Sequence, residues 1–169
     1  MRGGLSALAR PVSRWRNGQV IGGQMADELV VVGVDGSAES IEALRWAARY
    51  AEASGATIRA VRAWHYPAAV GPGPAGRTPQ TVTDHVQQEM LDQLDDALSA
   101  VYPGGPPDYV QTRLAYGHSA STLVSEAQEA DLLVVGNKGR GAFAGMLLGS
   151  VSMHCVTTAP CPVLVIRHS

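Results

Sequence analysis

The stretch Gly136-Asn137-Lys138-Gly139-Arg140-Gly141-Ala142-Phe143-Ala144-Gly145-Met146-Leu147-Leu148-Gly149-Ser150 decides the fold of this 169-residue chain. It follows the apolar run Leu132-Leu133-Val134-Val135, which predicts a strand buried on both faces of a sheet. After it, Ser150 is predicted to cap a helix that reaches Thr158. Glycines let a backbone approach an anion closely, and the free N–H groups of a helix start attract negative charge. The stretch is therefore predicted to be a phosphate-binding loop that leads into a helix.

Strand and helix patterns alternate from residue 29 onward, which indicates parallel strands joined by helical crossovers. Strands are predicted at 29–34, 57–64, 109–115, 132–135 and 163–166, and helices at 37–54, 81–101, 119–130 and 150–158. The helix at 81–101 is predicted to bury the stripe Leu91, Leu94, Leu98 and Val101. Residues 65–80 hold four prolines and three glycines, which predicts a loop.

The glycines of the quoted stretch follow a defined spacing: Gly136 and Gly139 form Gly-x-x-Gly, and Gly149-Ser150 follows after nine residues. This spacing resembles the nucleotide-binding signature of the universal stress protein family. The resemblance extends to Val30-Val31-Val32-Gly33-Val34-Asp35-Gly36-Ser37 and to Ala159-Pro160-Cys161-Pro162-Val163-Leu164-Val165-Ile166, and it covers residues 27 to 168. Three segments in the family's order are far more specific than a pair of glycines.

The predicted fold is α/β, a single domain with an open, doubly wound, five-stranded parallel sheet and helices on both faces. The alternation predicts the strands, and the resemblance implies their order, 3-2-1-4-5. In that order the strands 29–34 and 132–135 are neighbours whose connections leave toward opposite faces, so a ligand crevice opens at their carboxyl ends. Asp35 and Gly136 stand at those two ends. The two most distinctive loops therefore meet where the topology places a ligand.

The resemblance implies that this crevice binds ATP, with or without Mg. It assigns Gly136 and Gly139 to the α- and β-phosphates and Asp35 to the ribose or to a metal held through water. The main chain of Ala63 would meet the adenine, with Gly33 allowing close approach beside it. The expected nucleotide-binding residues are Gly33, Asp35, Ala63, Gly136, Gly139, Arg140, Gly149, Ser150, Val151 and Ser152. Two alternatives stay open: Asp35 serves a turn into the next helix, and Arg140 is a solvated loop charge.

The charges separate the chain into two parts. The first 24 residues contain four of the 13 basic residues, Arg2, Arg10, Arg14 and Arg16, and no acid. The rest holds nine basic and 15 acidic residues, about −6 at neutral pH, which argues against a nucleic-acid partner. Residues 1–25 are predicted to be a disordered leader or an upstream extension, and 26–169 the nucleotide-binding domain. No window has the roughly 18 apolar residues that cross a bilayer.

The cysteines and the motifs narrow the function. Two cysteines, Cys155 and Cys161, form no disulfide framework and are predicted to be buried thiols of a cytoplasmic protein. The P-loop pattern, the dinucleotide fingerprint and the nucleophile elbow are absent, so no catalytic residue is predicted. The predicted function is a cytoplasmic universal-stress-type protein that binds ATP and uses its occupancy as a stress-response signal or switch. The alternatives are a nucleotide-independent interaction or chaperone module, a weak ATPase and an adenylating enzyme.

The last strand predicts a partner. Pro162 opens it, and Val163-Leu164-Val165-Ile166 follows without a charge before Arg167. A bare edge of this kind is usually covered or paired. Antiparallel pairing about a two-fold axis would satisfy both copies, and the resemblance implies the same edge. A homodimer joined through Val163 and Val165 is therefore expected.

Overall fold

The computed structural model describes residues 28–65, 79–141 and 145–168, with the backbone alone at 79–82. The predicted leader at 1–25 and most of the predicted loop at 65–80 lie outside the described residues. The elements run β1 (Leu29–Gly33), α1 (Ala38–Ser54), β2 (Thr57–Trp64), α2 (Pro79–Val101), β3 (Val110–Tyr116), α3 (Ser119–Glu126), the 3-10 turn η1 (Ala127–Glu129), β4 (Leu132–Gly136), α4 (Ser150–Thr158) and β5 (Val163–Ile166). The predicted alternation of strand and helix is confirmed.

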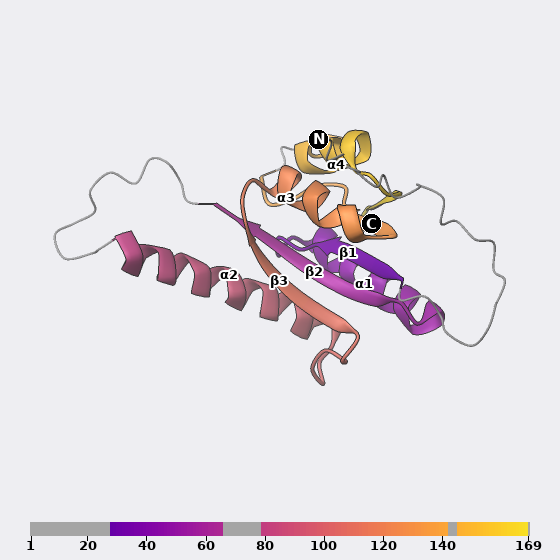
Figure 1. Ribbon diagram of the computed structural model, residues 1–169, viewed down its shortest axis with the longest axis horizontal. Helices are drawn as coiled ribbons and strands as arrows, with labels where there is room; N and C mark the ends of the chain where they lie inside the picture. Colours follow the sequence, from indigo (N-terminus) through magenta and orange to yellow (C-terminus); the bar gives the residue numbers. More distant parts are fainter. Residues whose placement is uncertain (1–27, 66–78, 142–144, 169) are drawn as a thin grey trace, which may run out of the picture.

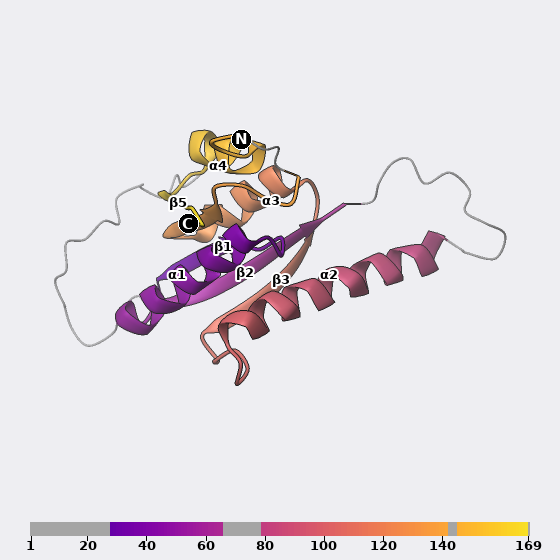
Figure 2. The ribbon, with the colours of Figure 1, turned by 180° about the vertical axis from the view of Figure 1, so that it is seen from behind.

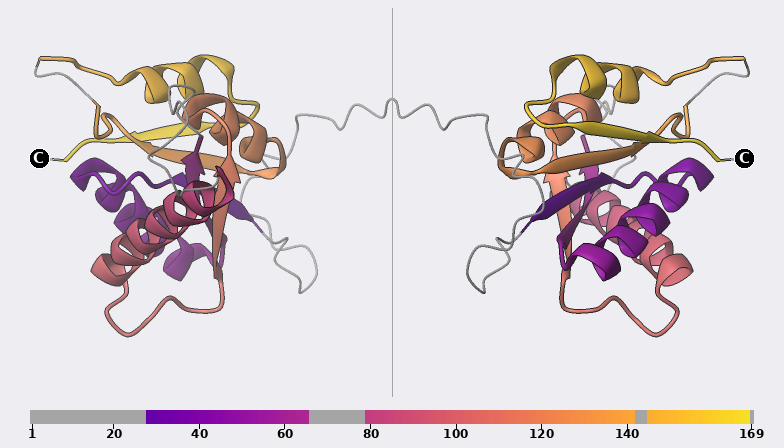
Figure 3. Two further views of the ribbon diagram at one scale, coloured as in Figure 1. Left: turned by 90° about the vertical axis from the view of Figure 1, so that its left-hand side faces the viewer. Right: turned by 90° about the vertical axis from the view of Figure 1, so that its right-hand side faces the viewer.

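The five strands form one parallel sheet in the order β3-β2-β1-β4-β5, as predicted. Figure 3 shows the layers edge-on, with α3 and α4 above the sheet and α1 and α2 below it. Alternate side chains of each strand point to opposite faces, which divides the core in two. Val30, Val32 and Ile58 pack toward α1 and α2, whereas Val31 and Leu133 pack toward α3 and α4.

The central position of β1 and β4 explains their composition. Val30, Val31 and Val32 have no exposed surface, and neither do Leu133 and Val134. Both strands are covered on two faces and paired on two edges, which favours apolar residues, above all valine, along them. Their carboxyl ends lie side by side in the sheet and give rise to the Asp35 loop and the glycine loop.

The ends of the helices follow from their capping residues. Ser37 caps α1 by accepting a hydrogen bond from the Ser40 N–H at 3.2 Å, and Gly55 ends the helix with φ +77, both as expected. At α4 the prediction is wrong: the cap position is Gly149, and Ser150 is the first residue inside the helix. Helix α3 also ends at Glu126 rather than near residue 130, because the chain tightens there into η1.

Helix α2 departs from its predicted packing at Leu91. Leu94 and Leu98 are buried as predicted, but Leu91 is 38% exposed. The helix has 23 residues, about 34 Å, whereas β2 has eight, about 26 Å. In Figure 1 the first half of α2 runs past the ends of the strands, and Figure 2 shows the same from behind. Leu91 lies near the middle of the helix, one turn before Leu94, and the buried part of the predicted stripe begins at Leu94.

Candidate functional site

Asp35 joins the two loops at the carboxyl ends of β1 and β4. Its Oδ1 accepts hydrogen bonds from the Ser37 N–H at 3.0 Å and the Ser37 hydroxyl at 2.5 Å. Its Oδ2 accepts a hydrogen bond from the backbone N–H of Arg140 at 3.0 Å. The structure therefore brings Asp35 and the glycine loop together, at the place where the sheet order put a crevice. The turn interpretation of Asp35 also holds, since the carboxylate organises the start of α1.

The same contacts set the charge of Asp35. Burial of the carboxyl raises its pKa, but the hydrogen bonds from Ser37, Arg140 and Ser40 together lower it more, so the pKa lies below the usual 3.8. Asp35 is thus an anion at neutral pH. It stabilises the loops and remains an acceptor for one further donor or cation.

Two glycines are required by close packing rather than by backbone conformation, since neither has a positive φ. A Cβ atom on Gly139 would lie 2.5 Å from Asp35 Oδ2. A Cβ atom on Gly136 would lie 2.8 Å from the Cβ atom of Glu39 and 2.9 Å from its backbone carbon, on α1. Gly139 therefore lets the loop touch Asp35, and Gly136 lets β4 touch α1.

The glycine loop is fastened at its base. Asn137 donates its backbone N–H to Ile166 O at 2.6 Å and accepts from the Gly149 N–H at 2.7 Å. Ser152 is a residue with 4% exposure, and its hydroxyl donates to Gly136 O at 2.6 Å. Ser152 was expected to donate to a phosphate, but its hydroxyl is engaged within the loop. The remaining donor of Ser152 is its backbone N–H.

The start of α4 presents donors toward this loop. Gly149 occupies the cap position and supplies no capping side chain. The backbone N–H groups of Ser150, Val151 and Ser152 lie in the first helical turn, where no acceptor exists within the helix. Together with the positive end of the helix dipole, three such N–H groups form an arrangement that suits a phosphate.

Gly33 and Ala63, expected near the adenine, belong to the face of the sheet covered by α3 and α4. A Cβ atom on Gly33 would lie 2.9 Å from Leu123 Cδ1, so this glycine makes room for α3. Ala63 is half-buried and pairs with Ala115 of β3. The structure thus shows a packing role for Gly33 beside α3.

Arg62 and Gln93, which the sequence analysis did not single out, contact Val34 and Arg140 beside the crevice. Arg62 of β2 is 8% exposed and donates from Nη2 to Gln93 Oε1 at 2.6 Å and from Nη1 to Val34 O at 3.4 Å. Arg140 donates from Nη1 to the same Gln93 Oε1 at 2.6 Å. Arg62 had a signal in the sequence, because Ile58, Ala60, Arg62 and Trp64 alternate on the buried face of β2 and a charged residue there is unusual. Gln93 had none, since it is one polar residue on a polar helix face.

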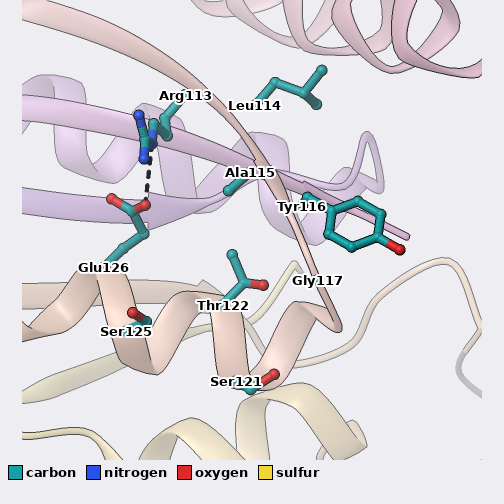
Figure 4. Close-up of a pocket in the computed structure, with 9 residues that line it drawn as sticks. All are labelled: Arg113, Leu114, Ala115, Tyr116, Gly117, Ser121, Thr122, Ser125 and Glu126. Atoms are coloured by element: carbon teal, nitrogen blue, oxygen red, sulfur yellow. Dashed lines mark hydrogen bonds and ion pairs between the residues drawn. The ribbon is translucent and has the colours of Figure 1, made fainter. Parts of the chain in front are cut away.

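A groove lies between β3 and α3, away from these loops. It has a volume of about 450 Å³, and Figure 4 shows Arg113 and Glu126 paired across one end of it and Tyr116 at the other. The Arg113 Nε to Glu126 Oε1 distance is 3.2 Å. The described ranges contain no group of three or more His, Cys, Asp or Glu side chains that could hold a metal ion. No described helix is long and apolar enough to cross a membrane.

The fold and the crevice define a class, the open Rossmann-like α/β proteins that hold a ligand at the carboxyl ends of central strands. The pattern of the universal stress protein family matches residues 28–167. The chain belongs to the universal stress protein family.

Its relatives place the chain within this family. A universal stress protein of Mycolicibacterium smegmatis is 34% identical over 141 residues, which are 82% of this chain and 47% of the relative. Universal stress protein Rv2623 of Mycobacterium tuberculosis is 35% identical over 146 residues, with the same two shares. The chain therefore spans about half the length of the curated relatives it matches.

Solved structures show the same fold. UspA of Lactobacillus plantarum superposes with a TM-score of 0.67 at 23% identity, over 85% of this chain and 100% of that one. A universal stress protein in complex with cAMP superposes with a TM-score of 0.54 at 32% identity, over 86% and 100%. The first comparison supports the fold, and the second shows that a relative binds a nucleotide.

Proposed function

We propose that this protein binds ATP in the crevice between Asp35 and the glycine loop and acts through nucleotide occupancy. The observation that carries this proposal is the start of α4, where the N–H groups of Ser150, Val151 and Ser152 have no acceptor within the helix and Gly149 provides no cap. The fastened loop and the relative in complex with cAMP support it. Gly136, Gly139, Arg140 and Gly149 then border the phosphates, and Asp35 faces the ribose or a hydrated Mg²⁺.

The proposed role depends on whether ATP is bound and not on its hydrolysis. Both oxygens of Asp35 accept hydrogen bonds from Ser37 and Arg140, so the carboxylate holds the loops in place and is poorly placed to activate a water. Hydrolysis of ATP is then slow at most. We assign the protein to the cytoplasm, in keeping with its free thiols Cys155 and Cys161.

The experiment identifies the ligand directly. The purified protein is denatured, and the released small molecules are identified by mass spectrometry; we expect an adenine nucleotide. Calorimetry on nucleotide-free protein should then show a lower Kd for ATP than for AMP, because charge-assisted hydrogen bonds to added phosphates contribute about 1.5–3 kcal/mol each. Equal affinities for the two nucleotides would contradict the proposed phosphate site.

We also propose that two copies of the chain pair through β5. Among the described elements, β5 is an edge strand that pairs with β4, and Val163 and Val165 are only half-buried. Sedimentation at micromolar concentration should show a dimer, and Val165→Pro should shift it toward monomer by removing a ladder donor. A monomeric unmodified protein would contradict this pairing.

A further inference from the structure

The end of β2 extends beyond β1, the strand beside it, and this leaves part of its main chain uncovered. The last paired residues of the two strands are Gly33 and Val61, and the Val34 N–H then donates to Val61 O at 2.9 Å. Along a parallel strand, every second residue directs its N–H and C=O toward the same neighbour. Ala63 therefore directs both groups toward the side of β1, where β1 has already ended.

These two groups of Ala63 are available to a ligand. Among the described residues, no backbone hydrogen bond joins Ala63 to β1 or to the loop that follows β1. The residue is half-buried, so a ligand can reach it. A donor beside an acceptor on a free strand edge suits an adenine, which presents a ring nitrogen acceptor beside its amino donor.

Two exposed imidazole rings lie next to this edge. His65 comes two residues after Ala63, on the face of β2 that α3 covers. Its ring contacts the ring of His118 at the start of α3, with the ring centroids 4.7 Å apart and the planes tilted by 40°. Because both residues are exposed, the pair presents aromatic surface beside the free edge of β2.

The main chain holds His118 in place without help from its ring. The Gly117 N–H donates to Trp64 O at 2.7 Å, which fastens this turn to the end of β2. His118 O accepts from the Thr122 N–H at 2.9 Å and from the Ser121 hydroxyl at 3.0 Å. His118 occupies the cap position of α3, but its side chain makes no capping hydrogen bond. The ring is therefore positioned by the fold and is not needed to cap the helix.

We propose that His65 and His118 form a stacking platform for the adenine base, whose polar edge binds the main chain of Ala63. This inference rests on the proposed function, because it concerns the base of the same nucleotide. A base stacks on an aromatic side chain through its π face, so the platform strengthens binding without hydrogen bonds of its own. In the rival role, the ring contact only joins the end of β2 to α3, and its loss changes stability but not affinity.

Calorimetry on the full chain tests the platform. In His65→Ala and in His118→Ala, the Kd for ATP should rise by about fivefold or more, and the Kd for AMP by the same factor, since both carry the base. His118→Phe restores an aromatic ring without imidazole nitrogens and should stay within about twofold of the unmodified protein. The control His154→Ala, which removes an exposed imidazole from α4, should leave both Kd values unchanged.

A fluorescent nucleotide gives a readout that a merely structural role would not change. The riboside triphosphate of 2-aminopurine loses fluorescence when its base stacks on an aromatic ring. Saturating amounts of the unmodified protein should quench it, and saturating amounts of His65→Ala or His118→Ala should quench it less. Both rings are exposed, so these variants should fold, and melting curves verify this.

The outcomes separate the two proposals. If the unmodified protein binds neither ATP nor AMP, the proposed function fails before any variant is made. If both bind, and both alanine variants keep the Kd values and the quenching, ATP binding stands and the stacking platform is overturned. A rise in the Kd for ATP with an unchanged Kd for AMP would also overturn the platform. An effect confined to one alanine variant would overturn the role of the other histidine.

Discussion

The crevice at the ends of β1 and β4 and the groove between β3 and α3 differ in how their charged groups are compensated. In the groove, Glu126 pairs with Arg113 at 3.2 Å through Oε1 and with Arg59 at 3.3 Å through Oε2. In the crevice, Arg62 and Arg140 share the neutral Gln93 as their hydrogen-bond partner, and the carboxylates of Asp35 and Glu89 act on Arg62 through charge. The first N–H groups of α4 lack a helical acceptor. The groove has a volume of about 450 Å³, but its carboxylate is already engaged by two cations.

This difference teaches that unused polar capacity, rather than concave shape, marks the candidate binding site. A ligand gains little where it must displace a formed ion pair, because the pair must first be broken and its ions rehydrated. It gains more where donors are already oriented and await an acceptor.

The largest effect is expected where the crevice is most closely packed. A Cβ atom at position 136 would lie 2.8 Å from Glu39 Cβ, which is too close for two carbon atoms. Gly136→Val therefore forces β4 to move away from α1. We expect the free energy of unfolding to fall by about 3 kcal/mol, the upper end for overpacking. Denaturant titration measures it. Gly141→Val is the matched control, since a Cβ atom there meets nothing within 4 Å, and it should change stability by less than about 0.5 kcal/mol.

Gly139→Val should act on binding. Its Cβ atom would lie 2.5 Å from Asp35 Oδ2, so the loop and the carboxylate must separate and the Arg140 N–H loses its acceptor. We expect the Kd for ATP to rise more than tenfold, about 1.4 kcal/mol, by calorimetry. The Asp35 carboxylate also accepts the hydrogen bonds from Ser37 that organise the start of α1. Its displacement should therefore also lower the thermal stability. An unchanged Kd would mean that Gly139 serves the turn alone.

Asp35→Asn should change the response to acid. The folded pKa of Asp35 is below 3.8, so its ionised form stabilises the protein above the unfolded pKa, and this contribution is lost as the pH falls through the folded pKa. Asp35→Asn should lower stability at pH 7 by about 1 kcal/mol. It should also flatten the decline in stability as the pH falls below about 4.

The control for this variant is Asp108→Asn, an exposed aspartate in the segment before β3. It removes the same charge without touching the crevice. Melting curves from pH 7 to pH 2 should follow the unmodified protein for this control. A decline equally steep in Asp35→Asn would show that other carboxylates dominate the acid response.

The sequence was sufficient for the strands and helices because the signals that specify them are local. Buried strands such as Val30-Val31-Val32, the Ser37 cap and Gly55 each follow from short-range chemistry, and all agree with the structure. The strand order came from the resemblance. What periodicity predicted less well were the ends of elements, as at Gly149, where the cap is a glycine whose N–H binds Asn137 O.

The site was predictable in part. The loops that begin at Asp35 and Gly136 were expected to meet, since the topology brings the ends of β1 and β4 together. The Gln93 contact could not be read from the sequence, because Gln93 belongs to α2 and its distance to Arg62 depends on how that helix crosses the sheet. The engagement of the Ser152 hydroxyl by Gly136 O is likewise a product of tertiary packing.

The smallest effect is expected in the groove. Arg113 is 61% exposed, and its ion pair with Glu126 is weakened by solvent, so Arg113→Ala should change the free energy of unfolding by less than about 1 kcal/mol. Glu126 keeps Arg59 as a partner, so no charge is left unpaired. Because the groove lies away from Asp35 and α4, the Kd for ATP should stay within about twofold of the unmodified protein, measured by the calorimetry used for Gly139→Val. A loss of ATP affinity in Arg113→Ala, with Gly139→Val unaffected, would reverse the comparison and move the nucleotide from the crevice to the groove.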